Sequence, residues 1–221
     1  MIKLENTVKP NEENIRPYIK ALEKALKENN NLEISKAHIA LADVYFYEQQ
    51  YQEGIDHYDA AILLAKGMDN KKLQARYIGV KGMAFLNGNI PEEGYTCFEE
   101  VLQIAEEIKD VALESDALGS MGLVYMETGD PGLAREKFTK ALALAEKIND
   151  QYRIMTQKGN LGNVHLTIAA ADDAYSCYAE ALAIAKELKD KVSQLGYLNN
   201  IGLLRDNAGN TEETILAFEE V

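Results

Sequence analysis

The sequence has no tryptophan, only four prolines and only two cysteines among its 221 residues. Two cysteines, Cys97 and Cys177, are too few to staple a small secreted scaffold, so a cytoplasmic location is expected. No apolar run reaches the roughly 18 residues of a membrane-spanning helix, and the first residues lack the apolar core of a signal peptide. We therefore expect neither membrane insertion nor export.

Positive charge is also scarce. Lysine and arginine number 23 against 36 aspartates and glutamates, which gives a formal net charge of −13. A surface of this sign repels phosphate backbones, so nucleic acid is not an expected partner. The residues that are abundant, among them Glu, Lys, Ala and Leu, lose little rotamer freedom in a helix, and 47% apolar content is enough for a continuous core.

The chain aligns with itself at a period of 40, in two columns that recur five times. The small-residue column holds Ala42, Gly82, Gly122, Gly162 and Gly202, and the aromatic column holds Tyr58, Phe98, Phe138, Tyr178 and Phe218. Neighbouring positions of the pattern are three and four residues apart, which predicts one stripe on each of two helices per unit. Each unit is therefore predicted to be a helical hairpin, with Asn70, Asp110, Asp150 and Asp190 as the N-caps that open new units.

The same phase predicts the organisation of the chain. We expect a polar segment over 1–13, a capping half-repeat helix over 14–33 and repeats over 34–221. The units are predicted at about 35–70, 71–110, 111–150, 151–190 and 191–221. Asn14 is the expected cap of the half-repeat helix, with Pro17 in its first turn. The last unit reaches Val221 before its second helix is as long as the others, so this helix is predicted to be incomplete.

The small and aromatic columns resemble the tetratricopeptide repeat over residues 14 to 221, most closely at Leu118 to Ala141. The period of 40 exceeds the usual 34, and with the segment Gly159 to Asn163 it is similar to the long repeats of G-protein-signalling modulators and kinesin light chains. The resemblance implies an all-α, right-handed superhelical solenoid of stacked antiparallel hairpins, with about 11 helices. It also implies a concave groove that binds peptide segments of partner proteins.

In that family the first helix of each unit faces the groove. The resemblance places there an apolar track of Met83, Leu86, Leu123, Met126, Leu166 and Leu203, and an amide strip of Asn160, Asn163, Asn199 and Asn200. The apolar track has a simpler interpretation as ordinary packing between helices. The amide strip could hydrogen-bond an extended peptide backbone, or could serve as local caps and polar surface.

A further column holds Gly79, Gly119 and Gly159 in the middle of first helices. Each such glycine costs about 1 kcal/mol relative to alanine. Two explanations remain open for this cost. Either neighbouring helices approach closely there, or the floor of the groove is kept open for a ligand.

Catalytic and metal-binding patterns are missing. His38, His57 and His165 lack the paired spacing of a metal site, and no phosphate loop, dinucleotide fingerprint or nucleophile elbow occurs. We therefore expect no enzyme, no metal and no cofactor. The predicted function is a scaffold or adaptor that binds a peptide or helix of a protein partner. The alternatives are a structural module that self-associates into a homo-oligomer through its C-terminal end, and a peptide-sensing regulator.

Overall fold

The computed structural model describes residues 11–207, which fall into two compact units divided between Lys109 and Asp110. The described residues form ten α-helices and no strand, in agreement with the predicted all-α class. In the first unit these are α1 (Glu12–Glu28), α2 (Asn31–Tyr47), α3 (Tyr51–Gly67), α4 (Lys71–Asn87) and α5 (Pro91–Ile108). In the second they are α6 (Val111–Glu127), α7 (Pro131–Lys147), α8 (Gln151–Thr167), α9 (Ala171–Glu187) and α10 (Lys191–Asn207).

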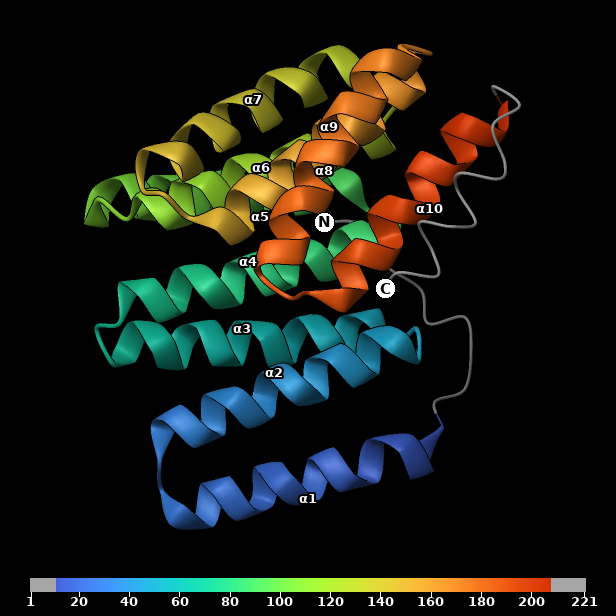
Figure 1. Ribbon diagram of the computed structural model, residues 1–221. Coiled ribbons are helices and arrows are strands. Elements are labelled where there is room, and N and C mark those ends of the chain that lie inside the picture. The colour runs from blue at the N-terminus through green and yellow to red at the C-terminus, as the bar shows by residue number, and fades with distance from the viewer. Residues whose placement is uncertain (1–10, 208–221) are drawn as a thin grey trace. The chain divides into compact units, whose positions relative to one another are not determined.

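Within each unit, consecutive helices pack against each other as antiparallel neighbours, which is clear for α1 to α4 in Figure 1. The closest pairs are α2 with α3, α4 with α5, α6 with α7 and α8 with α9. These are the predicted hairpins. None of the described helices is both long and apolar enough to cross a membrane.

First helices of neighbouring hairpins also contact each other within a unit, α2 with α4 and α6 with α8. The corresponding second helices, α3 with α5 and α7 with α9, make fewer direct contacts. The first helices therefore line the inner side of each unit.

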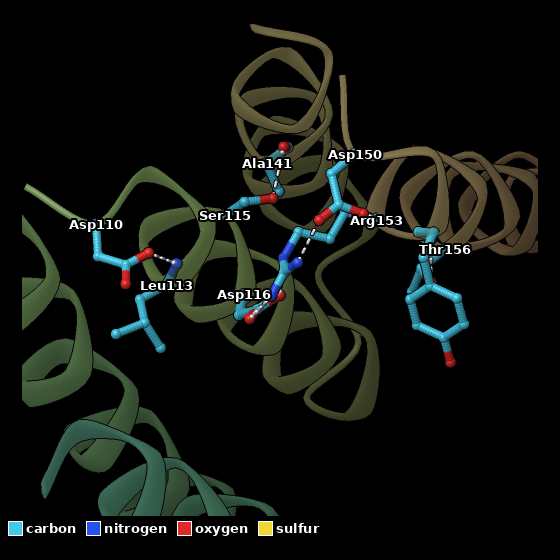
Figure 2. Close-up of polar contacts among 9 residues, drawn as sticks. Asp110, Leu113, Ser115, Asp116, Ala141, Asp150, Arg153 and Thr156 are labelled. Carbon is cyan, nitrogen blue, oxygen red and sulfur yellow. Dashed lines mark hydrogen bonds and ion pairs between the residues drawn. The ribbon is translucent and has the colours of Figure 1, made fainter. Parts of the chain in front are cut away.

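The predicted N-caps are confirmed. Each cap side chain accepts a hydrogen bond from the backbone N–H three residues later, at 3.0 or 3.1 Å: Asn70 from Leu73, Asp110 from Leu113, Asp150 from Arg153 and Asp190 from Ser193. Figure 2 shows the contact of Asp110. Asp150 acts on both sides of its turn, because its own N–H also donates to the carbonyl of Ala145 at 3.0 Å and so closes the preceding helix.

Every helix from α1 to α9 ends in a link of the same kind. Residues with positive φ recur 20 positions apart: Asn29, Gln49, Asp69, Asn89, Lys109, Gly129, Asn149, Ala169 and Lys189. All of these helices have 17 residues except α5, which has 18. The sequence period thus consists of two structural steps of equal length, one for each helix of the hairpin.

The start of the chain differs from the prediction. Helix α1 begins at Glu12 and is capped by Asn11, whereas Asn14 lies inside the helix and donates from Nδ2 to Glu48 Oε1 at 2.7 Å. Pro17 consequently lies beyond the first turn. Because proline has no N–H, it cannot donate the helical hydrogen bond to the carbonyl of the exposed Glu13. Glu48 explains the difference, because it also accepts from the N–H of Asn11 and so holds both asparagines at the end of α2.

The other predicted boundaries fall as follows. Helix α2 begins at Asn31, so the predicted border between 33 and 34 lies inside a helix, while the predicted units 71–110, 111–150 and 151–190 each hold one hairpin. The predicted second helix of the last unit, which would be the eleventh helix and would carry Phe218, lies outside the described residues, as does most of the predicted polar segment 1–13. The predicted self-association through the C-terminal end falls outside them as well.

The core of each hairpin is the contact between the two predicted columns. Phe98, Phe138, Tyr178 and Tyr58 are at most 1% exposed, and Gly82, Gly122, Gly162 and Gly202 are buried. A Cβ atom at Gly122 would lie 2.5 Å from Phe138 Cε1, and one at Gly162 would lie 2.5 Å from Tyr178 Cε1. The ring of the second helix therefore rests directly on the backbone of the first helix, which only glycine permits at this distance.

Candidate functional site

A cavity of about 570 Å³ opens on the inner side of the first unit, between α2, the start of α3 and α4. Four aromatic side chains line it, Phe46, Tyr47, Tyr51 and Tyr58, and its charged lining residue is Asp43. We call it the aromatic cavity. Its volume lies within the roughly 300 to 1,000 Å³ of ligand-binding pockets.

The aromatic cavity has a rigid wall and an accessible rim. Phe46 packs edge-to-face against Tyr51 and tilted against Tyr58, with ring centroids 5.4 and 5.5 Å apart, and this geometry is favourable for aromatic pairs. Tyr58 is fully buried, whereas Tyr47 is 83% exposed. A ligand entering the cavity would meet preformed ring faces and, at the rim, the exposed ring of Tyr47.

Asp43 gives the cavity its charge, and it remains accessible to solvent. The Tyr58 hydroxyl donates a hydrogen bond to Asp43 Oδ1. Partial burial of the carboxyl raises the pKa of Asp43, although this hydrogen bond acts in the opposite direction. Burial, reinforced by the hydrogen bond to Asp43, also raises the pKa of Tyr58. No lysine or arginine lines the cavity, so its electrostatic character is negative.

The predicted amide strip lies on α8 and α10 in the second unit, and two of its members already have partners. Asn163 Oδ1 accepts a hydrogen bond from the Tyr178 hydroxyl at 2.6 Å, and Asn160 Nδ2 donates to Gln157 Oε1 at 3.3 Å. Asn199 is exposed and Asn200 is half-buried. The two amides on α8 thus contact their own chain, whereas on α10 Asn199 is exposed to solvent.

The contact of Asn163 belongs to a pattern that sequence analysis missed. The residue 15 positions before each ring of the aromatic column matches that ring in polarity. Asp43 and Asn163 precede Tyr58 and Tyr178, whereas Met83 and Leu123 precede Phe98 and Phe138. Where the ring is a tyrosine, the residue 15 positions earlier is a hydrogen-bond acceptor. Where the ring is a phenylalanine, that residue is apolar. Reading the two columns together would have revealed this pairing.

The predicted apolar track is divided among different environments. Leu123 and Met126 are half-buried and pack against the core cluster of Phe138, Leu161 and Val164. In the first unit Met83 lines the aromatic cavity, while Leu86 is half-buried in the hairpin beside Gly94. Leu166 and Leu203 are 42% and 55% exposed. The track is therefore partly core and partly accessible surface.

The glycine column is explained by close helix approach at two of its three positions. A Cβ at Gly159 would lie 2.6 Å from the ring of Tyr197, and one at Gly119 would lie 2.9 Å from the Gln157 amide. These glycines make room for large side chains of the next first helix. Gly79 is different, because a Cβ there would meet only Val101 at 3.8 Å.

A bridge between α6 and α8 is a further feature that the sequence did not reveal. Arg153 donates from Nε and Nη2 to the two carboxylate oxygens of Asp116, at 2.8 and 2.6 Å, and from Nη1 to Asp150 (Figure 2). Asp116 and Asp150 together raise the pKa of the half-buried guanidinium, with the hydrogen bonds to Asp116 as the largest cause. The bridge fixes the register of two inner helices.

His38 and His57, which the sequence places 19 residues apart, meet in the first hairpin with their Nδ1 atoms 2.9 Å apart. The ring of Tyr45 stacks on His57, with centroids 5.4 Å apart. Partial burial lowers the pKa of both histidines. No group of three metal-ligating side chains occurs among the described residues, so the pair is best described as a hydrogen bond between neutral imidazoles.

The first hairpin should consequently lose stability in mild acid. The folded pKa values lie below the ordinary value of 6.5, so the unfolded chain binds more protons as the pH falls below that value. Protonation also removes the acceptor of the Nδ1 contact. We expect a lower melting temperature at pH 5.5 than at pH 7.5. The variant His38→Ile/His57→Cys, which copies Ile78 and Cys97 of the next unit, should show a smaller difference, and an equal difference would contradict this role of the pair.

Comparison with solved structures shows the same fold at low sequence identity. The chain superposes on BtubC (BKLC) from P. vanneervenii with a TM-score of 0.78 and 16% identity, covering 95% of this chain and 88% of that one. For repeats of a putative kinesin light chain from Podosopora anserina the TM-score is 0.63 at 15% identity, covering 84% and 91%. For a Rap protein complexed with Competence and Sporulation Factor it is 0.71 at 16%, covering 93% of this chain but only 64% of the Rap protein.

No curated protein matches the sequence. A family model described as "Tetratricopeptide repeat" matches residues 115–148, which contain most of α6 and all of α7. The small and aromatic columns of that segment recur at the same spacing in the hairpins α2–α3, α4–α5 and α8–α9. Residues 115–148 therefore match one tetratricopeptide repeat, and the same columns continue through the other described hairpins.

Proposed function

We propose that the protein is an adaptor that holds an extended peptide segment of a partner protein on its inner helices. The observation that carries this proposal is the aromatic cavity, a preformed hollow of ligand size on the inner side of the first unit. Aromatic walls with a few polar groups are typical of binding pockets. Packing of the hairpin does not require Tyr47 to be aromatic, because this side chain is mostly exposed.

The second unit offers a surface of a different kind on its own inner helices. Leu166 and Leu203 expose apolar area, and Asn199 exposes an amide on the same helix as Leu203. An amide side chain can donate to and accept from a peptide backbone whatever its sequence, while leucines select apolar side chains. Leu166, Leu203 and Asn199 are thus the exposed members of the predicted apolar track and amide strip in this unit.

A structural neighbour supports a binding role. The Rap protein was solved in a complex with Competence and Sporulation Factor, so a protein of this fold holds a partner. The proposed partner is a protein or peptide, and the proposed location is the cytoplasm, as the scarcity of cysteine suggests.

Selection from a random peptide library displayed on phage, against the full chain, tests the proposal. We expect a shared motif, and synthetic peptides carrying it should bind in a titration followed by fluorescence anisotropy. Leu203→Gln should weaken binding about tenfold if the motif contacts the second unit, because burial of a leucine contributes about 1.5 to 3 kcal/mol. Tyr47→Ala should weaken binding if the motif contacts the first unit instead.

The matched control is Leu133→Gln, the same change at a 39% exposed position on the second helix α7. Its affinity should equal that of the wild type. Light scattering of the peptide-free protein distinguishes the alternative of a self-associating module. The absence of any enriched peptide, or peptides whose affinity depends on neither Tyr47 nor Leu203, would contradict binding on the inner helices.

A further inference from the structure

We propose that the aromatic cavity receives a lysine or arginine side chain of the partner peptide, with its charge beside Asp43 and its carbon chain against the rings. This inference rests on the proposed adaptor function and specifies what the first unit recognises. It assigns Asp43 the role of a recognition group, and assigns Phe46 and Tyr47 the role of the surrounding aromatic surface.

The lining suits a long cationic side chain. A cation near the face of a tyrosine or phenylalanine is attracted by the negative ring face, and the effect grows when water is excluded. Lysine and arginine also carry apolar stems that pack well on aromatic surface while the charged end stays polar. The cavity offers both in one place, since Phe46, Tyr51 and Tyr58 form its wall and Asp43 lies among them.

The charge of Asp43 is unbalanced within the protein. Its Oδ1 accepts the Tyr58 hydroxyl, and no described lysine or arginine forms an ion pair with it. Its carboxylate is therefore accessible at the cavity and has no cation beside it. An acidic ligand would be repelled, and an apolar ligand would take the carboxylate out of water without compensation. A cationic side chain is the occupant that complements this charge, and the net charge of −13 attracts it at long range.

The hairpins of this same chain show that folding does not need a charge at position 43. Tyr58 requires only a hydrogen-bond acceptor, and the neutral Asn163 fulfils this requirement for Tyr178 in the hairpin α8–α9. Two other hairpins replace the polar pair altogether with Met83 and Leu123 against phenylalanine. Packing therefore requires only an acceptor at position 43 and not the negative charge of Asp43. This charge lies at the aromatic cavity.

Methyl NMR on the full chain tests the proposal. The protein is labelled at the methionine methyl groups, of which Met83 lines the cavity, and is titrated with three blocked amino acids. The probes are Nα-acetyl-lysine methylamide, the arginine equivalent and the norleucine equivalent, which has the stem of lysine without its charge. We expect saturable shifts at Met83 with the lysine and arginine probes, at an affinity about tenfold higher than for norleucine, the size of a charge-assisted hydrogen bond.

Two variants and one control test which side chains cause the preference for the cationic probes. Asp43→Asn keeps an acceptor for Tyr58, as Asn163 does for Tyr178, and should remove the preference for lysine over norleucine at unchanged melting temperature. Tyr47→Ala, at an exposed rim position, should weaken both cationic probes severalfold. Glu99→Gln makes the same change of charge on the exposed face of α5 and should leave all three titrations unchanged.

Equal affinity for the lysine and norleucine probes, or a lysine preference that survives in Asp43→Asn, would overturn the inference. Such a result would leave the adaptor function standing if peptides from the phage selection still bind. Conversely, a lysine preference that depends on Asp43 in a protein that selects no peptide would support the cation site and reject the adaptor function. The two proposals can therefore fail separately.

Discussion

Gly122→Leu is expected to destabilise the protein by several kcal/mol, at or above the roughly 1 to 3 kcal/mol typical of overpacked cores. Even a Cβ at this position would approach three ring carbons of Phe138 within 2.5 to 2.8 Å. Phe138 is fully buried and cannot turn away without disturbing Leu161 and Val164, which pack in the same cluster. The midpoint of urea denaturation, followed by circular dichroism, measures the loss.

Gly196→Leu is the matched control, because Gly196 also lies inside a first helix but has no heavy atom within 4 Å of a built Cβ. Removing a mid-helix glycine without a clash should leave stability unchanged or raise it by up to about 1 kcal/mol. Only Gly122→Leu should thus lower the midpoint of denaturation. Similar losses from both would mean that the ring contact at Gly122 is not what limits side-chain size there.

The second large effect concerns the polar pair in the hairpin α8–α9. Asn163→Leu should destabilise the protein by about 1 to 3 kcal/mol, because it leaves the buried hydroxyl of Tyr178 without its acceptor. Tyr178→Phe alone should cost less, since Asn163 is exposed and water can replace the lost donor. The double variant Asn163→Leu/Tyr178→Phe copies Leu123 and Phe138, and it should recover most of the loss from Asn163→Leu.

A double-mutant cycle from thermal melts of the four proteins measures the coupling. The control pair is Asn199→Leu with Tyr178→Phe, because Asn199 is exposed and belongs to a different helix, so the effects should add. Additivity in the Asn163 cycle itself would show that the hydrogen bond does not contribute to stability. In that case Asn163 would again be available to a partner peptide, as the amide strip requires.

The hairpins and their caps could be predicted from sequence because both depend on short-range spacing. Asp150 caps a residue only three positions away, and the glycine and aromatic columns recur in register with the helices that carry them. The prediction failed at the N-terminus, where Asn11 and Asn14 are equally suitable caps by sequence. The choice between them is decided by Glu48, a contact across 34 to 37 residues that no local pattern contains.

The candidate site was harder to predict for a related reason. Helical phase indicates which residues face the inner side, but not whether another helix already satisfies them. Asn163 and Leu123 occupy equivalent positions, and only the ring opposite each one explains its polarity. The aromatic cavity escaped prediction because its lining extends along the sequence from Asp43 to Gly88, and so combines the end of α2, the start of α3 and the side of α4.

The equal links between helices restrict which insertions and deletions this chain can accept. Positive φ returns at every twentieth position from Asn29 to Lys189, so each helix together with its link forms a step of constant length. Loss or duplication of two steps, a whole hairpin, would bring identical junctions together and preserve the alternation of inner and outer helices. A change by a single step would also preserve every turn, yet it would place two outer helices in succession, so that a ring such as Phe138 would face no glycine. Lineages of this protein should therefore differ in length by whole hairpins, although the backbone geometry of the turns would allow half of one.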